Sequence, residues 1–196
     1  SEIFLTDVEV PEDSIVGGEG NGARVALTLL GFERALGGFT AALAYEVELE
    51  RLVVLIRGKR LAKDSLVRDR LVRCATKVRA IKCLSKEILL SLQAGRTPGP
   101  ESSLIKLLSS EYRQQVTTLA VEILGPDIVA PTGMDGVWSL GPQPMGLEPL
   151  SAVAWTRDYL QARPGTVYGG SSQIQRNTIA EQILGLPREG LRGEPR

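Results

Sequence analysis

The chain has 196 residues, 43% of them hydrophobic, and its 23 Lys and Arg residues balance its 23 Asp and Glu residues. This length and composition are typical of one globular domain with a sizeable core. A formal net charge of zero gives no electrostatic reason to expect nucleic acid or an anionic membrane as a partner. The absence of histidine removes the commonest metal ligand and general base, so no metal site is predicted.

At residues 1–11, hydrophobic and polar side chains alternate as they do in a β-strand. No partner strand follows nearby, and a lone strand cannot satisfy its own backbone groups. We therefore interpret residues 1–18 as the end of a preceding β domain and its linker, which makes the chain a fragment. Asn21 follows a glycine-rich turn and is a candidate N-cap for the helix after it.

Apolar residues then recur at spacings of three and four, which predicts a series of amphipathic helices. The expected helices cover about residues 23–57, 64–92, 101–124, 150–162 and 172–184. The predicted fold class is therefore all-α, an antiparallel helical bundle over residues 19–189 with a polar tail at 190–196. The Gly- and Pro-rich segment 125–149 is long for a loop, and such loops are more often functional or interfacial than idle.

The two cysteines, Cys74 and Cys83, lie in one predicted helix. Nine residues of helix separate them by about 13 Å along the axis, which is too far for a disulfide within that helix. Reduced thiols favour a cytoplasmic location. Charged residues interrupt each helical apolar stretch, so no membrane span is predicted.

Two short constellations have residues that could carry chemistry. The first is the Glu33-Arg34 pair within the first long helix, where a solvated charge pair is the alternative interpretation. The second is the run from Tyr168 to Arg176, in which two glycines and two serines precede a helix. A helix N-terminus offers unpaired N–H groups to a polar or anionic ligand, although an ordinary capped turn would look the same.

The run from Gly165 to Glu189, with its Tyr-Gly-Gly-Ser-Ser-Gln-Ile-Gln-Arg-Asn core, resembles the C-terminus of acyl-CoA dehydrogenases. The opening, Asp7 to Pro11 and then Glu33-Arg34, resembles the start of the same helical domain. The resemblance covers residues 1–189. It implies a flavoprotein oxidoreductase of fatty acid or lipid metabolism, with FAD as cofactor and a helical and a β domain that are absent from this chain.

In that family a glutamate takes the α-proton of an acyl-CoA thioester while the β-hydrogen leaves as hydride to FAD. The usual glutamate position is Gly169 here, which has no side chain. Some family members carry the base on the long helix before an arginine, and Glu33 matches that position. The resemblance thus implies Glu33 as catalytic base, with Arg34 near the substrate and flavin.

The final loop of the family holds both substrate and cofactor. The resemblance assigns the backbone of Gly169 and Gly170 to the thioester carbonyl, and Ser171, Ser172 and Gln173 to FAD. A hydrogen-bonded, desolvated carbonyl lets negative charge accumulate on its oxygen, which lowers the barrier to α-proton removal. The base needs a carboxyl group whose pKa is raised by burial.

Other positions depart from the family pattern where it contacts the FAD of a neighbouring subunit. An arginine followed by Phe-Gly is missing near Arg57, and a flavin-contacting glutamine is replaced by Asp69 or Arg70. In the loop that normally cradles the pyrophosphate, the glutamine is Glu122, with Asp127 nearby. These acidic residues predict a chain that is poor at completing its neighbour's FAD site.

Three functions therefore stay open. The first is one subunit of a divergent bacterial acyl-CoA dehydrogenase, a homo- or hetero-oligomer that passes electrons to an electron-transfer flavoprotein or a similar acceptor. The second is a non-catalytic structural subunit, and the third is an acyl-CoA oxidase. We expect exposed apolar faces on the first two long helices, hence dimers or tetramers, and we expect the fragment alone to be inactive.

Overall fold

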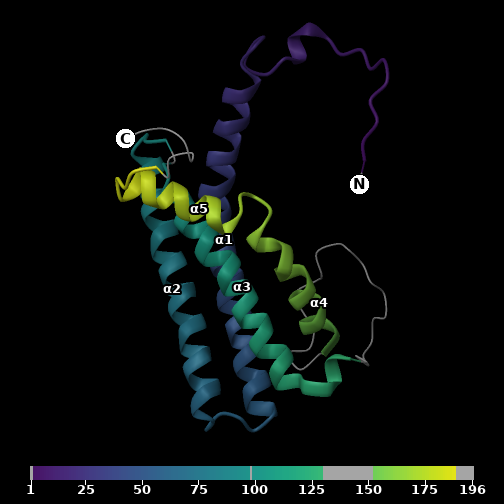
Figure 1. Ribbon diagram of the computed structural model, residues 1–196, viewed down its shortest axis with the longest axis vertical. Coiled ribbons are helices and arrows are strands. Elements are labelled where there is room, and N and C mark those ends of the chain that lie inside the picture. The colour runs from purple at the N-terminus through teal and green to yellow at the C-terminus, as the bar shows by residue number, and fades with distance from the viewer. Residues whose placement is uncertain (1, 98, 130–151, 189–196) are drawn as a thin grey trace, which may run out of the picture.

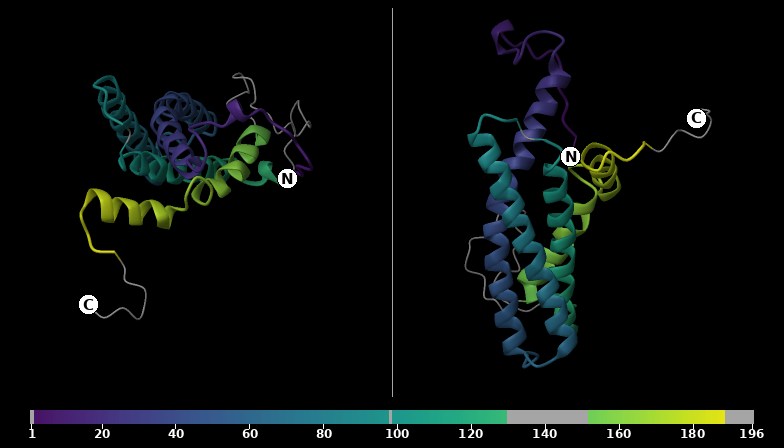
Figure 2. Two further views of the ribbon diagram at one scale, coloured as in Figure 1. Left: turned by 90° about the horizontal axis from the view of Figure 1, so that it is seen from above. Right: turned by 90° about the vertical axis from the view of Figure 1, so that its left-hand side faces the viewer.

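The computed structural model describes residues 2–97, 99–129 and 152–188, without the side chains of residues 34–36. Three long helices run side by side in alternating directions (Figures 1 and 2). They are α1 (Gly22–Gly58), α2 (Ser65–Gln93) and α3 (Ser102–Leu124), and each contacts the other two. The all-α prediction is confirmed, since the described residues contain helices and turns but no strand.

Shorter elements continue from the end of α3. The chain passes through η2 (Gly125–Ile128), and α4 (Ala152–Ala162) then packs on α3 (Figure 1). A turn of 3-10 helix, η3 (Arg163–Thr166), leads to α5 (Ser172–Thr178), which also contacts α3 and ends in a π-helical turn, η4 (Ile179–Ile183). Because α3 contacts all the other α-helices, it is the central element of the bundle.

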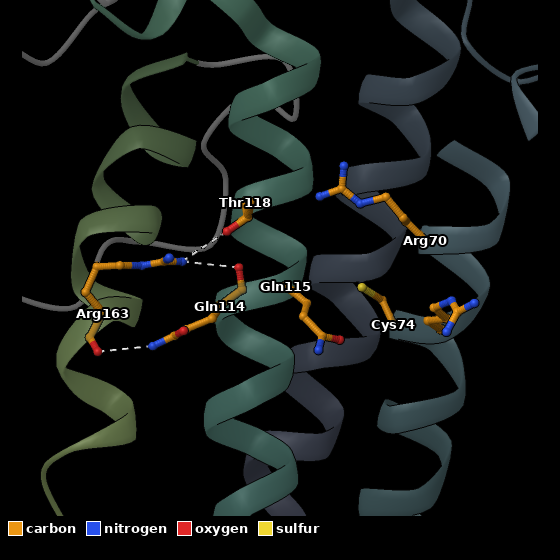
Figure 3. Close-up of a pocket in the computed structure, with 7 residues that line it drawn as sticks. Arg70, Cys74, Gln114, Gln115, Thr118 and Arg163 are labelled. Carbon is orange, nitrogen blue, oxygen red and sulfur yellow. Dashed lines mark hydrogen bonds between the residues drawn. The ribbon is translucent and has the colours of Figure 1, made fainter. Parts of the chain in front are cut away.

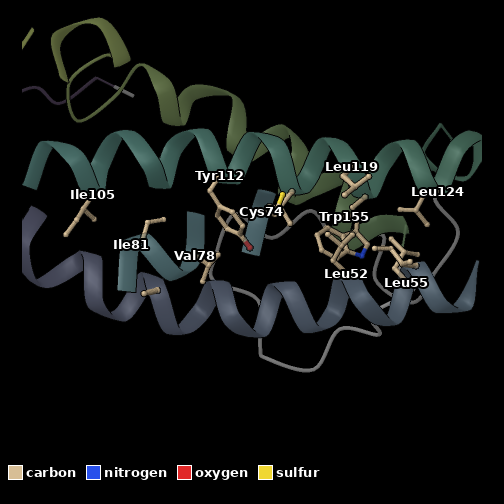
Figure 4. Close-up of a cluster of buried hydrophobic side chains, with 14 of the residues drawn as sticks. Leu52, Leu55, Cys74, Val78, Ile81, Ile105, Tyr112, Leu119, Leu124 and Trp155 are labelled. Carbon is tan, nitrogen blue, oxygen red and sulfur yellow. The ribbon is translucent and has the colours of Figure 1, made fainter. Parts of the chain in front are cut away.

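Aromatic and aliphatic side chains from α1 to α4 make one continuous core (Figure 4). Trp155 and Tyr112 are its largest members, and both are fully buried. The helices approach closely at Gly38, where an added Cβ would lie 2.8 Å from Ile105 Cγ2 and 2.9 Å from Ser85 Oγ. Glycine is therefore needed at this position for α1 to pack against α2 and α3.

The first turns of α1 extend beyond the bundle (Figures 1 and 2), and their apolar residues face solvent. Leu27 is 71% exposed and Leu29 is 66% exposed. Exposed apolar residues also occur on α2, including Leu66 and Val72. Exposed apolar residues are thus present on both helices. Within the described residues, no helix is both long enough and apolar enough to cross a membrane.

Several local predictions need correction or fall outside the described residues. The interpretation of residues 1–18 as the end of a preceding β domain stays a prediction: residues 2–11 are exposed and form no strand, since no pairing partner lies among the described residues. Asn21 precedes α1, but its amide donates to the Gly17 carbonyl at 2.9 Å and caps no N–H of α1. Most of segment 125–149 and the tail 190–196 lie outside the described residues.

Candidate active site

The turn between η3 and α5 takes a backbone conformation that only glycine adopts easily. Gly169 and Gly170 have φ angles of +65° and +93°. Such angles are strained for a residue with a side chain. Ser171 then caps α5, because its Oγ accepts a hydrogen bond from the Ile174 N–H at 3.3 Å. The Gly-Gly-Ser order thus follows from the geometry of a tight turn into a capped helix.

Two long polar side chains fix this glycine turn by its carbonyl groups. Lys106 on α3 donates from Nζ to the Gly165 carbonyl at 3.1 Å and also to the Gly170 carbonyl. Gln175 on α5 donates from Nε2 to the Gly169 carbonyl at 3.1 Å. Among the described residues, no hydrogen bond engages the N–H groups of Gly169 and Gly170. The turn can therefore offer these donors to a ligand.

The turn and residues 30–45 of α1 line one open pocket of about 220 Å³. Glu33 lies in its wall from α1, and Gly169 and Tyr168 lie in its wall from the turn. Lys106 and Ser109 contribute from α3. The structure thus brings a carboxyl group and the glycine turn to the same cavity, although 136 positions separate Glu33 from Gly169 (169 − 33).

The remaining predicted site residues take different environments. The side chain of Arg34 lies outside the described part of the chain. Glu33 is exposed, so the described residues do not supply the burial that a base in this reaction needs. Ser172 is buried, and its Oγ has no hydrogen-bond partner among the described residues, whereas Gln173 is exposed. An unsatisfied buried hydroxyl beside the turn fits a polar group bound there.

The start of the turn is fixed to α3 by a second set of hydrogen bonds (Figure 3). Gln114 donates from Nε2 to the Arg163 carbonyl at 3.2 Å and to Thr166 Oγ1 at 3.0 Å. Arg163 donates back to Thr118 Oγ1 at 3.2 Å and stacks over the Tyr159 ring at 4.1 Å. Gln114, Thr118 and Arg163 also line a pocket of about 330 Å³, together with residues of α2. Their hydrogen bonds position η3 and therefore the glycine turn that follows it.

At the opposite end of the bundle, the acidic residues that replace the family's cofactor contacts have cationic partners. Lys59 contacts Asp127, with Nζ and Oδ2 2.9 Å apart. Arg70 pairs with Glu122. The negative charge expected near a pyrophosphate is thus balanced within the chain, and Arg70 is already engaged. Neither Lys59 nor Arg70 is therefore free to bind a pyrophosphate.

A buried charged network, which sequence reasoning missed, lies in the middle of α1. Glu48 is 4% exposed and pairs with Arg113 from α3. Arg113 and Arg51 each lie 3.8 Å from a carboxylate oxygen of Asp158 on α4. Burial raises the pKa of the Glu48 carboxyl to about 6, although the Arg113 guanidinium opposes this shift. The signal in the sequence is that Glu48 falls on the same face of the helix as the core residue Leu52.

Comparisons with known proteins identify the family. The family described as acyl-CoA dehydrogenase, C-terminal domain, matches residues 20–184. The chain is 36% identical over 190 residues to the acyl-CoA dehydrogenase IpdE1 of Mycobacterium tuberculosis, an alignment that covers 96% of this chain and 44% of that protein. It is 26% identical to the short/branched chain specific acyl-CoA dehydrogenase of rat mitochondria, over 93% of this chain and 39% of that protein.

A solved structure has the same fold. The glutaryl-coenzyme A dehydrogenase in complex with glutaryl-CoA superimposes with a TM-score of 0.71 at 23% identity, over 97% of this chain and 46% of that one. The chain spans less than half the length of these relatives. The chain therefore belongs to the acyl-CoA dehydrogenase family, of which it contains the C-terminal domain.

Proposed function

We propose that the polypeptide containing this chain is a subunit of an FAD-dependent acyl-CoA dehydrogenase, and that Glu33 is its catalytic base. The observation that carries the proposal is that Glu33 and Gly169 line one pocket. The family's usual base position has no side chain here, and Glu33 is the carboxyl group that lines this pocket. An acyl-CoA is accordingly the expected substrate.

Each part of the pocket has a role in the proposed reaction. The thioester carbonyl binds at the N–H groups of Gly169 and Gly170, which stabilise negative charge on its oxygen as the α-proton leaves. Glu33 accepts that proton on a carboxylate oxygen. Bound FAD supplies the acceptor for the β-hydrogen, which leaves as hydride. Surfaces outside this chain must bury Glu33, because it is exposed in the described structure.

The residues that open α5 fit a contact to the flavin. Ser172 has a buried, unsatisfied hydroxyl. Ser171 uses its Oγ as a cap, so it would contact the cofactor through its backbone. Gln173 is exposed at the start of the helix and is available to a second surface. Arg34 follows Glu33 in α1 and is proposed to lie near the substrate.

The other end of the bundle supports a hetero-oligomer in which the sites are divided between two related chains. Glu122 and Asp127 are paired with cations of the same chain, so this end is poorly suited to a partner's pyrophosphate. The same observation, together with Gly169, favours a second candidate, a non-catalytic structural subunit. For the enzyme, we propose a cytoplasmic location and an electron-transfer flavoprotein or similar acceptor.

The test uses the full-length subunit assembled with its partner chain. Glu33→Gln keeps the shape of the side chain but removes the base, so α-proton exchange of a bound acyl-CoA in D₂O should fall by about 10²- to 10⁴-fold. Glu50→Gln is the matched control, because Glu50 is an exposed glutamate of α1 outside the pocket. Exchange at the wild-type rate in Glu33→Gln would contradict the assignment.

Two further measurements separate the alternatives. The first is the flavin absorbance per chain of the assembled complex with Ser172→Val in this chain. The substitution should lower the flavin content if this chain is an FAD-binding enzyme, and should leave the flavin content of the partner unchanged if this chain is a structural subunit. Release of hydrogen peroxide during turnover in air would identify an oxidase in place of a dehydrogenase.

A further inference from the structure

Lys106 connects the glycine turn with the pocket that contains Glu33. It lies in the second turn of α3 and lines both this pocket and a neighbouring cavity of about 280 Å³. Its side chain is half-buried, and its Cε would lie 3.7 Å from a Cβ added at Gly169. The aliphatic part of the lysine thus passes along the turn, and its ammonium group lies beside the carbonyl groups of the turn.

The ammonium group of Lys106 holds the turn at two points. Its Nζ donates to the Gly165 carbonyl at 3.1 Å and also to the Gly170 carbonyl. These two acceptors are five positions apart (170 − 165), so one side chain of α3 closes the segment that contains Gly169. Gln175 donates to the turn as well, but its amide is neutral. Because a charged donor forms stronger hydrogen bonds, Lys106 makes the stronger contacts.

The glycine turn needs such contacts to keep one shape. Gly169 and Gly170 both have positive φ angles, and glycine has more conformational freedom than any other residue. Two successive glycines therefore do not fix the directions of their own N–H groups. Hydrogen bonds that stabilise a developing oxyanion require donors that are held in place before the reaction. Side chains outside the turn must supply that order.

The anchored carbonyl groups determine where the N–H groups point. In a planar trans peptide the C=O and N–H bonds point in opposite directions. Gln175 holds the Gly169 carbonyl at 3.1 Å, so the Gly170 N–H of the same peptide unit points away from Gln175. Lys106 fixes the next carbonyl, that of Gly170. The Gly170 N–H thus lies between two anchored carbonyl groups and has a fixed direction.

From these contacts we infer that Lys106 is a positioning residue of the proposed reaction. Its ammonium group holds the turn in the conformation in which the N–H groups of Gly169 and Gly170 bind the thioester oxygen. Gln175 assists from α5. This inference rests on the proposed function, which assigns these N–H groups to the thioester, and it requires no contact between Lys106 and the substrate.

The test uses the full-length subunit assembled with its partner chain, and three thioesters: butanoyl-CoA, octanoyl-CoA and cyclohexanecarbonyl-CoA. The thioester with the highest wild-type kcat/KM for flavin reduction is used for all variants. Lys106→Met keeps an unbranched side chain of similar length but has no donor. Its kcat should fall by about 10- to 100-fold, which is less than the loss of about 10²- to 10³-fold on removing a whole oxyanion donor. KM should change by less than about threefold, because the contact acts mainly in the transition state.

The carbonyl group of the bound thioester provides a second measurement. Hydrogen bonds to a carbonyl lower its stretching frequency, which difference infrared spectroscopy detects when the thioester carries ¹³C at this carbon. The comparison is between Glu33→Gln and the double variant Glu33→Gln/Lys106→Met, neither of which should consume the thioester. The double variant should show the higher frequency, because its N–H donors are less well aligned. A purely structural role of Lys106 in the fold would not change this frequency.

Two variants serve as controls. Lys86→Met removes an exposed lysine of α2 that lines neither cavity, and it should leave kcat and the carbonyl frequency unchanged. Lys106→Arg keeps a charged side chain with several N–H donors and should retain most of both. If Lys106→Met does not fold, Lys106→Gln, which is uncharged and shorter, takes its place in the same measurements.

A wild-type kcat in Lys106→Met, a change confined to KM, or an unchanged carbonyl frequency overturns this inference. Loss of α-proton exchange in Glu33→Gln would still leave the proposed function in place. The absence of both flavin reduction and α-proton exchange with all three thioesters overturns the proposed function, and this inference with it.

Discussion

The middle of the bundle and the end that carries the glycine turn are both built on the three long helices. They differ in how fully their side chains are buried and paired. Around Trp155 and Tyr112, large side chains are fully buried and Glu48 pairs with Arg113, although Glu48 Oε2 has no hydrogen-bond partner among the described residues. At the other end, Glu33 is exposed, Leu27 faces solvent and the Ser172 hydroxyl is unsatisfied. The difference teaches that this chain contains a complete core and only part of a site.

The largest expected effect is a loss of stability when a core side chain is removed. Trp155→Ala removes a fully buried indole that packs among α1, α3 and α4, and large-to-small changes of this kind destabilise by about 3–5 kcal/mol. Leu27→Ala is the control, because Leu27 is 71% exposed and surface changes cost about 0.5 kcal/mol or less. Urea unfolding measures both values. Equal losses of stability in the two variants would contradict the contrast between the regions.

A medium effect comes from the buried carboxyl of Glu48. Its pKa rises from 4.5 to about 6 on folding, so between these pH values the folded chain binds more protons than the unfolded chain. The stability contributed by this group is full below pH 4.5 and decreases by about 2 kcal/mol as the pH rises through 6.

The measurement is the difference in unfolding free energy between the wild type and Glu48→Gln, followed from pH 4 to pH 7. The wild type should lose stability relative to the variant over this range. Two parallel curves would show that Glu48 keeps the same pKa in the folded and unfolded chain.

The smallest effect compares the ends of two helices. Asp64 caps α2, with Oδ1 accepting from the N–H groups of Leu66 at 2.9 Å and Val67 at 3.0 Å. Asp64→Ala should therefore cost about 1 kcal/mol. Asn21→Ala should cost less, since Asn21 caps no N–H of α1. Thermal unfolding of both variants measures this difference in stability. A larger loss of stability for Asn21→Ala than for Asp64→Ala would contradict the prediction.

Sequence periodicity was sufficient for the helices, because an apolar stripe at spacings of three and four leaves little choice of secondary structure. The helix over 23–57 forms as α1 with a difference of one residue at each end. The end of the last helix was harder to predict. A π-helical turn over 179–183 replaces the α-helix there, and no residue type in the sequence marks such a turn.

The site was only partly accessible from the sequence, for a physical reason. The residue types at Glu33 and Gly169 pointed to chemistry, but only the packing of α1 against the glycine turn places them in one pocket. Lys106 and Ser109 gave no signal, since a lysine or serine in a helix is usually solvated. Their roles depend on contacts between elements that are distant in sequence.

The adjacent glycines Gly37 and Gly38 of α1 differ in the substitutions that they tolerate. At Gly38, any side chain collides with Ile105 and Ser85, so substitutions there are filtered by folding. At Gly37 an added Cβ would meet no atom within 4 Å, so folding does not exclude a side chain there. A library of substitutions at position 37 should thus give folded protein, whereas the same library at position 38 should yield mainly insoluble protein.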